Sequence, residues 1–264
     1  MEKGVPIRSV SRALAVLKLI NRHGAITLME VARESRLAYP TACRIVQTLM
    51  VEGMVEFEPS RKRYRATRLV ETLSMGYRDH DNLIEKGRPH IVALTKLVNW
   101  PITITTRVGQ SVMVRDNTYE MSSLSFSRYY RGYTLPILEC AAGHVSIAYS
   151  EDEVREVLLR GLQEVGAKSL ALDMFLSGRL TARIKTDGFV LNDRTVHTDN
   201  PGKTSSISVP IMERAREVAE LTLSYFSTAM NPAEATRRYV DLVKQTASDI
   251  TQAASAEDQA LEVA

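Results

Sequence analysis

The chain has few of the features that mark secreted or membrane proteins. Its 264 residues include two cysteines, Cys43 and Cys140, which fall in different predicted domains, so no disulfide framework is expected. No run approaches the roughly 20 apolar residues that cross a bilayer, and residues 1–6 lack the apolar core of a signal peptide. We therefore expect a cytoplasmic protein with no membrane partner.

Signs of catalysis and of cofactor binding are also scarce. The sequence has no glycine-rich phosphate loop, and its histidines and cysteines show no metal-ligand spacing. Cys140 and His144 are four residues apart, so on a helix they would share a face and could mimic a nucleophile and its base. No third orienting group is evident. We expect no catalytic residues, no metal and no cofactor, and keep a Cys/His enzyme as the weaker alternative.

Positive charge is concentrated near the start of the chain. Up to Arg68 there are 13 Lys and Arg against 6 Asp and Glu, whereas the totals for the whole chain are 34 and 31. The net charge of +3 is therefore the sum of a strongly basic N-terminal part and a mildly acidic remainder of the chain. Such an asymmetry is typical of a protein that binds nucleic acid through one end.

Residues 27–51 have the pattern of a helix-turn-helix. Thr27 and Glu30 form a capping box, which predicts a helix to residue 33 or 34. Pro40 suits the first turn of a second helix that continues to residue 51. That helix has an apolar stripe and an opposite, mainly polar side. The stripe is Ile45, Val46, Leu49 and Met50, and the other side carries Tyr39, Thr41, Arg44 and Gln47.

A basic hairpin follows the second helix. Two short runs, 54–57 and 63–66, flank a turn at 59–62 that carries Arg61 and Lys62. A polar helix face beside a cationic hairpin fits a winged domain that enters the major groove and grips phosphates. Double-stranded operator DNA is the expected partner, with a ligand-independent architectural DNA binder as the alternative. The candidate contacts are Arg8, Arg12, Tyr39, Thr41, Arg44, Gln47, Arg61, Lys62 and Arg63.

Helices are predicted on both sides of this motif. One runs from about residue 10 to 22, with Val10, Leu14, Leu17 and Ile20 on its packed face. After the hairpin, Thr67 can cap a linker helix that we expect to join the domains and to pair with its copy in a second chain. The predicted domains are 1–66 (winged helix-turn-helix), 67–82 (linker helix), 83–254 (effector domain) and 255–264 (frayed tail).

The rest of the chain alternates between helical and extended patterns. Strands are predicted at 102–106, 112–114, 124–128, 189–191, 206–209 (ended by Pro210) and 221–226, and helices at 83–98, 138–149, 152–162, 170–186 and from Pro232 onward. Helices segregated around an antiparallel sheet make an α+β fold, of the kind used by small-molecule sensor domains.

Several short motifs occur in a specific order along the chain. They are Arg8-Ser9-Val10-Ser11-Arg12-Ala13-Leu14, Thr41 with Arg44, Gln47-Thr48-Leu49, Leu135-Pro136, Ala141-Ala142-Gly143, Asp187-Gly188-Phe189 and Ser206-Ile207-Ser208-Val209-Pro210. Together they resemble the IclR family of transcriptional regulators. Trp100-Pro101 and the runs 124–128 and 135–138 are similar to the family's activators of aromatic-acid (3-hydroxyphenylpropionate) catabolism.

This resemblance implies an overall plan and a set of partners. The family joins a winged helix-turn-helix to a GAF-like effector domain, and its members form dimers that often assemble into tetramers on DNA. An aromatic-acid effector and an activator role, with RNA polymerase as a possible partner, follow from the closer likeness. The implied effector pocket comprises Ala141, Ala142, Gly143, Asn192, Asp193, Ser206, Thr222 and Ser224.

An aromatic carboxylate also needs a group that binds its charge. Arg128, near Phe126, and Arg194 could each clamp the carboxylate, or could instead form surface ion pairs. The amides at the start of the helix after Pro136 are a further candidate. The chain departs from the family pattern at His144, at Arg194 and at 212–216, where the usual glycine is missing. These departures affect the predicted ligand more than the fold.

Overall fold

The computed structural model describes residues 7–75, 81–124, 129–167, 169–193, 203–213 and 216–262. It divides the chain into two compact units, Met1–Asp79 and His80–Ala264. Each unit has its own hydrophobic core. They are described separately below.

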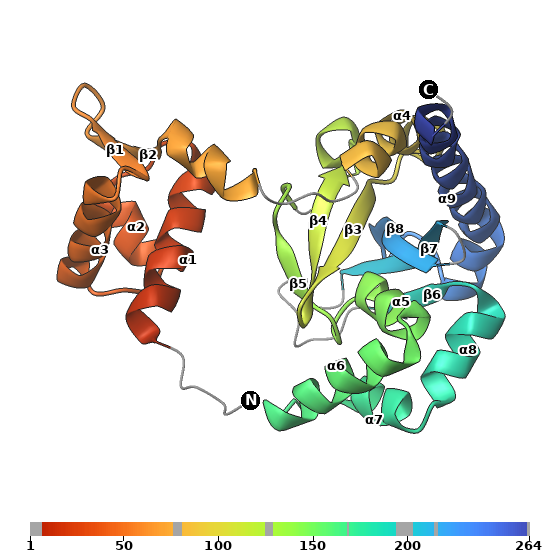
Figure 1. Ribbon diagram of the computed structural model, residues 1–264. Helices are drawn as coiled ribbons and strands as arrows, with labels where there is room; N and C mark the ends of the chain where they lie inside the picture. The colour runs from red at the N-terminus through yellow and green to blue at the C-terminus, as the bar shows by residue number, and fades with distance from the viewer. Residues whose placement is uncertain are drawn as a thin grey trace. The chain divides into compact units, whose positions relative to one another are not determined.

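The first unit contains the predicted helix-turn-helix and hairpin (Figure 1). Its capping box is present, since the Glu30 amide donates to Thr27 Oγ1 at 3.3 Å and the Thr27 amide donates to the Glu30 carboxylate at 2.9 Å. Pro40 lies in the first turn of the second helix of the motif, as predicted. The elements are α1 (Arg8–His23), α2 (Leu28–Glu34), α3 (Tyr39–Val51), β1 (Val55–Glu58) and β2 (Arg63–Ala66).

The packed face of α1 differs from the prediction. Leu17 and Ile20 are buried as expected, but Val10 and Leu14 are each 52% exposed. The buried residues of α1 all lie in its C-terminal half, where α2 and α3 pack against it. The first two turns of α1 therefore present an apolar stripe that the rest of this unit does not cover.

The linker begins as predicted but is not an α-helix. Thr67 Oγ1 accepts a hydrogen bond from the Leu69 amide at 3.2 Å and caps the 3-10 helix η1 (Arg68–Ser74). No residue of η1 is buried. The segment therefore lacks the tertiary packing that stabilises most α-helices in proteins, and it forms a short 3-10 helix instead. The sequence places Leu69, Leu73 and Tyr77 at every fourth position of the predicted linker helix, but Tyr77 lies outside the described residues. The sequence also predicts that residues 79–82 separate the linker helix from the next one, whereas the next helix already begins at Asp81.

The second unit is an α+β domain with a six-stranded antiparallel sheet, which confirms the predicted fold class. The strand order is β5-β4-β3-β8-β7-β6. Its elements are α4 (Asp81–Val98), β3 (Ile102–Val108), β4 (Ser111–Asn117), the 3-10 helix η2 (Tyr119–Met121), β5 (Thr134–Pro136), α5 (Ala141–Tyr149), α6 (Asp152–Glu164), α7 (Leu170–Leu176), α8 (Arg179–Asp187), β6 (Val190–Asp193), β7 (Thr204–Glu213), β8 (Arg216–Phe226) and α9 (Pro232–Glu262).

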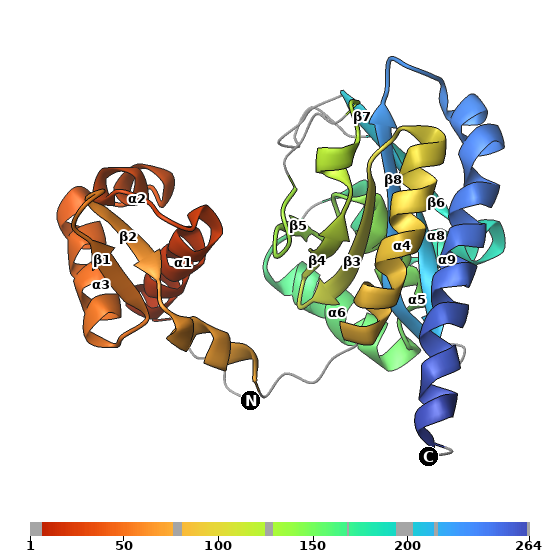
Figure 2. The ribbon, with the colours of Figure 1, turned by 90° about the horizontal axis from the view of Figure 1, so that it is seen from above.

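Helices cover both faces of this sheet. On one face α4 and α9 lie side by side and bury Ile91 and Ile250 against Ile104 and Leu221 (Figures 1 and 2). On the other face α5 packs against the central strands, and α6, α7 and α8 gather around it. Among the helices that the structure describes, none is long and apolar enough to cross a membrane.

Several predicted boundaries in this unit need correction. A third strand was expected at 124–128, but residues 125–128 lie outside the described residues and the additional strand is β5. The helix expected at 170–186 is two helices, α7 and α8, because the chain turns at Ser177 and at Gly178, whose φ is +73°. The helix expected from Leu138 begins at Ala141, with Cys140 as its N-cap.

Two elements continue beyond their expected ends. β7 runs through Pro210 to Glu213, because β6 pairs only as far as Ser208 and leaves one side of β7 without a ladder at Pro210. A residue that lacks an amide hydrogen is tolerated at such an edge. The backbone of α9 continues to Glu262, past Ser255, where the sequence predicted a frayed tail.

Gly143 lies very close to the backbone that precedes α5. A Cβ atom added there would lie 2.0 Å from the carbonyl oxygen of Ile137, which is backbone and cannot swing aside. We predict that Gly143→Ala lowers the unfolding free energy of this unit by at least about 2 kcal/mol. Urea unfolding followed by the fluorescence of Trp100, the single and buried tryptophan, would measure it.

Gly161→Ala in α6 is the matched control. An added Cβ there meets only the flexible end of Gln110 at 3.1 Å. Because alanine is favoured over glycine inside a helix by roughly 0.5–1 kcal/mol, this variant should be as stable as the parent or more stable. Equal stability of the two alanine variants would show that the approach at Gly143 is not tight in solution.

Candidate DNA interface and effector pocket

The candidate DNA-reading side chains lie on the outer side of α3. Ala42, Val46 and Leu49 face the core of the unit. Arg44 and Gln47 are exposed, Tyr39 is half exposed and Thr41 is half-buried. The helix therefore offers these four side chains to a partner, as its sequence pattern predicted. Arg8 and Arg12 are exposed in the first turns of α1.

The three cations of the wing do not have the same surroundings. Lys62 is exposed at the tip, with a φ of +50°. Arg61 lies 3.7 Å from the carboxylate of Glu58. Arg63 donates from Nη1 to the carbonyl oxygen of Ala25 at 3.0 Å, and so fastens the wing to the connection between α1 and α2. Arg63 thus has a structural role that sequence reasoning missed.

Five of the residues implied for the effector pocket meet between α5 and the sheet. Ala141 and Ala142 from α5 face Ser206, Thr222 and Ser224 from β7 and β8 around a cavity of about 30 Å³. Seven further residues complete the wall: Thr103, Thr105, Val114, Tyr119, Tyr129, Leu135 and Cys140. The alternation of Thr103 and Thr105 with Ile102 and Ile104 was a signal for a polar strand face that the prediction did not use.

The other residues implied for this pocket lie elsewhere. Gly143 is turned toward the carbonyl of Ile137, and Asn192 lines a second, larger pocket. Asp193 is the last residue of β6. Phe126, Arg128 and Arg194 lie outside the described residues, so the arginine clamp for a carboxylate stays a prediction.

Cys140 and His144 face different surroundings. Cys140 Sγ accepts from the Gly143 amide at 3.4 Å and lines the small pocket. The His144 ring hydrogen-bonds through Nε2 to the carbonyl oxygen of Leu138 at 2.9 Å and lines the larger pocket. Burial lowers the pKa of His144, although the bond to Leu138 opposes the shift. This arrangement does not support a nucleophile and base that work together.

A pair of carboxyl groups lies next to the small pocket. Glu220 is fully buried on β8 and accepts a hydrogen bond from Thr105 Oγ1 at 2.6 Å. Burial and the neighbouring Glu220 raise the pKa of Glu217 to about 10, against the opposing effect of Arg107 and Arg216. Burial also raises the pKa of Glu220. At neutral pH the pair therefore keeps a proton that two exposed glutamates would have lost.

A helix-turn-helix with a wing, joined to an α+β domain that has pockets beside its sheet, is the plan of a ligand-responsive regulator of transcription. The sequence comparison agrees. Residues 9–59 match the IclR helix-turn-helix domain, and residues 75–252 match the bacterial transcriptional regulator IclR C-terminal domain. The chain belongs to the IclR family of transcriptional regulators, which confirms the family that its motifs suggested.

Solved structures share the fold over nearly the whole chain. An IclR homologue from Microbacterium hydrocarbonoxydans, complexed with 4-hydroxybenzoate, has a TM-score of 0.68 and 20% identity, covering 94% of this chain and 99% of that one. The Thermotoga maritima IclR has a TM-score of 0.62 and 19% identity, covering 93% and 98%. An IclR regulator from Alicyclobacillus acidocaldarius has a TM-score of 0.62 and 18% identity, covering 95% and 100%.

The carboxyl pair predicts how stability changes with pH. Because the pKa of Glu217 is raised on folding, its stabilising effect is complete below the unfolded value near 4.5 and is lost as pH rises toward about 10. One proton released on unfolding lowers the unfolding free energy by about 1.4 kcal/mol per pH unit. We predict that Glu217→Gln flattens this decline and raises stability at pH 9, measured by urea unfolding between pH 6 and 9.

Glu153→Gln is the control, because Glu153 is exposed on α6. Its stability curve should run parallel to that of the parent. If the Glu217→Gln curve also runs parallel to the parent, Glu217 does not retain a proton in the folded chain.

Proposed function

We propose that this regulator is a transcriptional activator controlled by a small aromatic carboxylic acid that binds between α5 and the sheet. The observation that carries the proposal is the lining of the small pocket, which combines two tyrosine rings with serine and threonine hydroxyl groups. The M. hydrocarbonoxydans homologue, solved with 4-hydroxybenzoate, supports an acid of this kind. The activator role comes from the sequence likeness to activators of aromatic-acid catabolism.

The pocket wall has a group for each part of such a ligand. Tyr119 and Tyr129, with ring centroids 5.3 Å apart in an edge-to-face arrangement, can receive an aromatic ring. Ser206 and Ser224 line the same pocket, and their hydroxyls can bind a ring hydroxyl. The amides of the first turn of α5 are suited to the carboxylate.

Binding must also enlarge this pocket. A cavity of about 30 Å³ has room for one or two water molecules and not for an aromatic ring. In our proposal the acid therefore binds a wider form of this pocket. In that form Tyr129 lies farther from α5 and the strands. A ligand that favours the enlarged form shifts the equilibrium between two states by its difference in affinity for them.

The DNA-binding unit is proposed to read a two-fold operator as part of a dimer. The uncovered stripe on α1, formed by Ile7, Val10 and Leu14, and the exposed Leu73 of the linker are suited to a second copy of the chain. Two recognition helices about 34 Å apart would meet successive major grooves on one side of the DNA. The effector would act by changing the relative pose of the two units of each chain.

Arg44 and Lys62 are proposed to contact DNA in different ways. Arg44 projects from α3 toward base edges, so Arg44→Ala should lose about 1–3 kcal/mol of discrimination between operator and scrambled DNA. Lys62→Ala should weaken binding to both DNAs alike and reduce the salt slope by about 1. Fluorescence anisotropy with DNA from upstream of the chain's own gene, at several salt concentrations, measures both effects.

Arg33→Ala is the control for a lost surface charge, since Arg33 lies on α2 and is 74% exposed beside Glu34. It should leave discrimination unchanged. An equal loss on both DNAs for Arg44→Ala would overturn its role as a base contact. Equal binding of operator and scrambled DNA by the parent protein, unaffected by any ligand, would instead favour the architectural alternative.

Ser206 and Ser205 offer a matched test of the effector pocket, because neighbouring residues of β7 face opposite sides of the sheet. Ser206 lines the pocket, whereas the Ser205 hydroxyl lies 3.0 Å from that of Ser227. We predict that Ser206→Ala weakens binding of 3-(3-hydroxyphenyl)propionate or 4-hydroxybenzoate by roughly 3- to 10-fold, as expected for one hydrogen bond.

Isothermal titration of the full chain measures this effect. Ser205→Ala should bind the same acid as tightly as the parent. If neither acid binds the parent protein, the proposed effector class is wrong. If both variants lose affinity equally, the acid does not lie against Ser206.

A further inference from the structure

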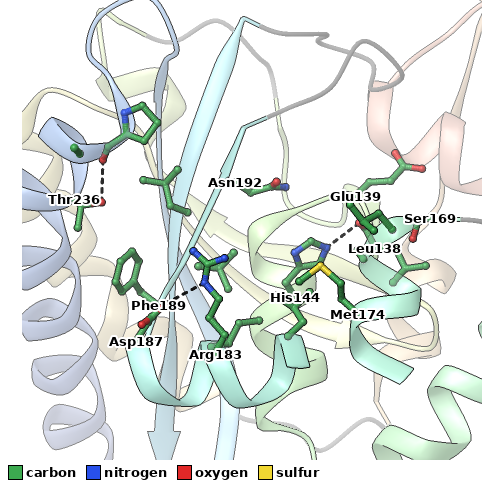
Figure 3. Close-up of a pocket in the computed structure, with 18 residues that line it drawn as sticks. Leu138, Glu139, His144, Ser169, Met174, Arg183, Asp187, Phe189, Asn192 and Thr236 are labelled. Carbon is green, nitrogen blue, oxygen red and sulfur yellow. Dashed lines mark hydrogen bonds and ion pairs between the residues drawn. The ribbon is translucent and has the colours of Figure 1, made fainter. Parts of the chain in front are cut away.

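A pocket of about 890 Å³ lies beside the first turn of α5, away from the small pocket (Figure 3). Its walls come from the chain before α5, from α7 and α8, from β6 and from the first turn of α9. The volume is within the range of roughly 300–1,000 Å³ that is usual for small-molecule sites. None of its lining residues is shared with the small pocket.

The start of α5 separates the two pockets. Cys140, Ala141 and Ala142 line the small one, whereas Leu138, Glu139 and His144 line the large one. Figure 3 shows His144 bonded to Leu138 on this side of the helix. The large pocket is therefore a separate compartment and not an extension of the proposed effector site.

Its lining is mainly apolar. Eleven of the 18 described lining residues have aliphatic, aromatic or proline side chains, which suit a ring or a short hydrocarbon. These residues are Leu138, Leu170, Ala171, Met174, Leu180, Ile184, Phe189, Val190, Leu191, Pro232 and Ala233. The other seven described lining residues are polar or charged and can orient a ligand: Glu139, His144, Ser169, Arg183, Asp187, Asn192 and Thr236.

The charges in the wall do not favour an anion. Arg183 is the cation among the described lining residues, and it is paired with Asp187 at 3.5 Å. Glu139 adds a negative charge. Lys244 stands behind the wall, where its ammonium donates to the carbonyl oxygen of Asp187 and lies 5.4 Å from the ring centre of Phe189. Glu139, Asp187 and Arg183 thus give the described wall a net charge of −1, which disfavours a carboxylate there.

His144 provides a group that can recognise a hydroxyl. Burial lowers its pKa, so the ring is neutral at pH 7. When Nε2–H donates to the Leu138 carbonyl, Nδ1 is left as a hydrogen-bond acceptor. Asn192 and Thr236 offer further polar groups in the same wall. A neutral ligand with one hydroxyl would meet these requirements.

We propose that this pocket is a second ligand site, which binds a neutral aromatic alcohol or phenol. The occupant differs in charge from the acid proposed for the small pocket. The proposal does not depend on that acid, because the two sites have separate walls and can be tested with different molecules.

The test compares 1-naphthol, which is neutral near pH 7, with 1-naphthoate, which has the same rings and a negative charge. Both are titrated into the full chain by isothermal calorimetry. We expect 1-naphthol to bind at least roughly tenfold more tightly than 1-naphthoate. Equal or tighter binding of 1-naphthoate would overturn the ligand class, and no binding of 1-naphthol would overturn the site.

Two substitutions on opposite walls place the ligand. Ala171→Trp in α7 and Ala233→Trp in α9 should each weaken 1-naphthol binding by at least roughly tenfold, because each places an indole at the wall against which the ligand would pack. Ala233 is exposed, so the second variant should fold even if the first does not. Leu176→Trp and Arg237→Trp, exposed on the same helices and outside the lining, are the controls and should bind like the parent. Undiminished binding by folded Ala233→Trp would place the ligand elsewhere.

Discussion

The close packing of α5 against the loop that precedes it determines how this helix is placed in the second unit. At Gly143 the helix backbone approaches the Ile137 carbonyl so closely that no side chain fits between them. This contact fixes where α5 begins, and therefore which of its residues face each side. The first turn of α5 contributes side chains to both pockets, so a movement of that turn would change the shape of both.

Local patterns in the sequence predicted much of the fold. The Thr27–Glu30 capping box, Pro40 and the alternation along the strands act within a few residues, and their structural consequences are the same in most surroundings. The polar lining of the small pocket was found partly through the family motifs around Ala141 and Ser206. Thr103 and Thr105 show that the strand pattern alone could have added more.

What the sequence did not predict depends on contacts between distant residues. Val10 and Leu14 fit the helical stripe of α1, but only the positions of α2 and α3 determine that this end is uncovered. Pro210 was expected to end a strand, and it does not because β6 stops short of it. The bond from Arg63 to Ala25 spans 38 residues, so the local pattern could not show that this predicted phosphate contact also fastens the wing to the connection between α1 and α2.

The backbone at the tip of the wing has a consequence for engineering. Lys62 adopts a φ of +50°, a conformation that costs most L-amino acids roughly 1 kcal/mol and costs glycine very little. Glycine at this position would relax the turn and at the same time remove the cation that we propose holds DNA. A directed-evolution screen scored by heat resistance alone would therefore tend to enrich robust proteins with a weakened grip on their operator.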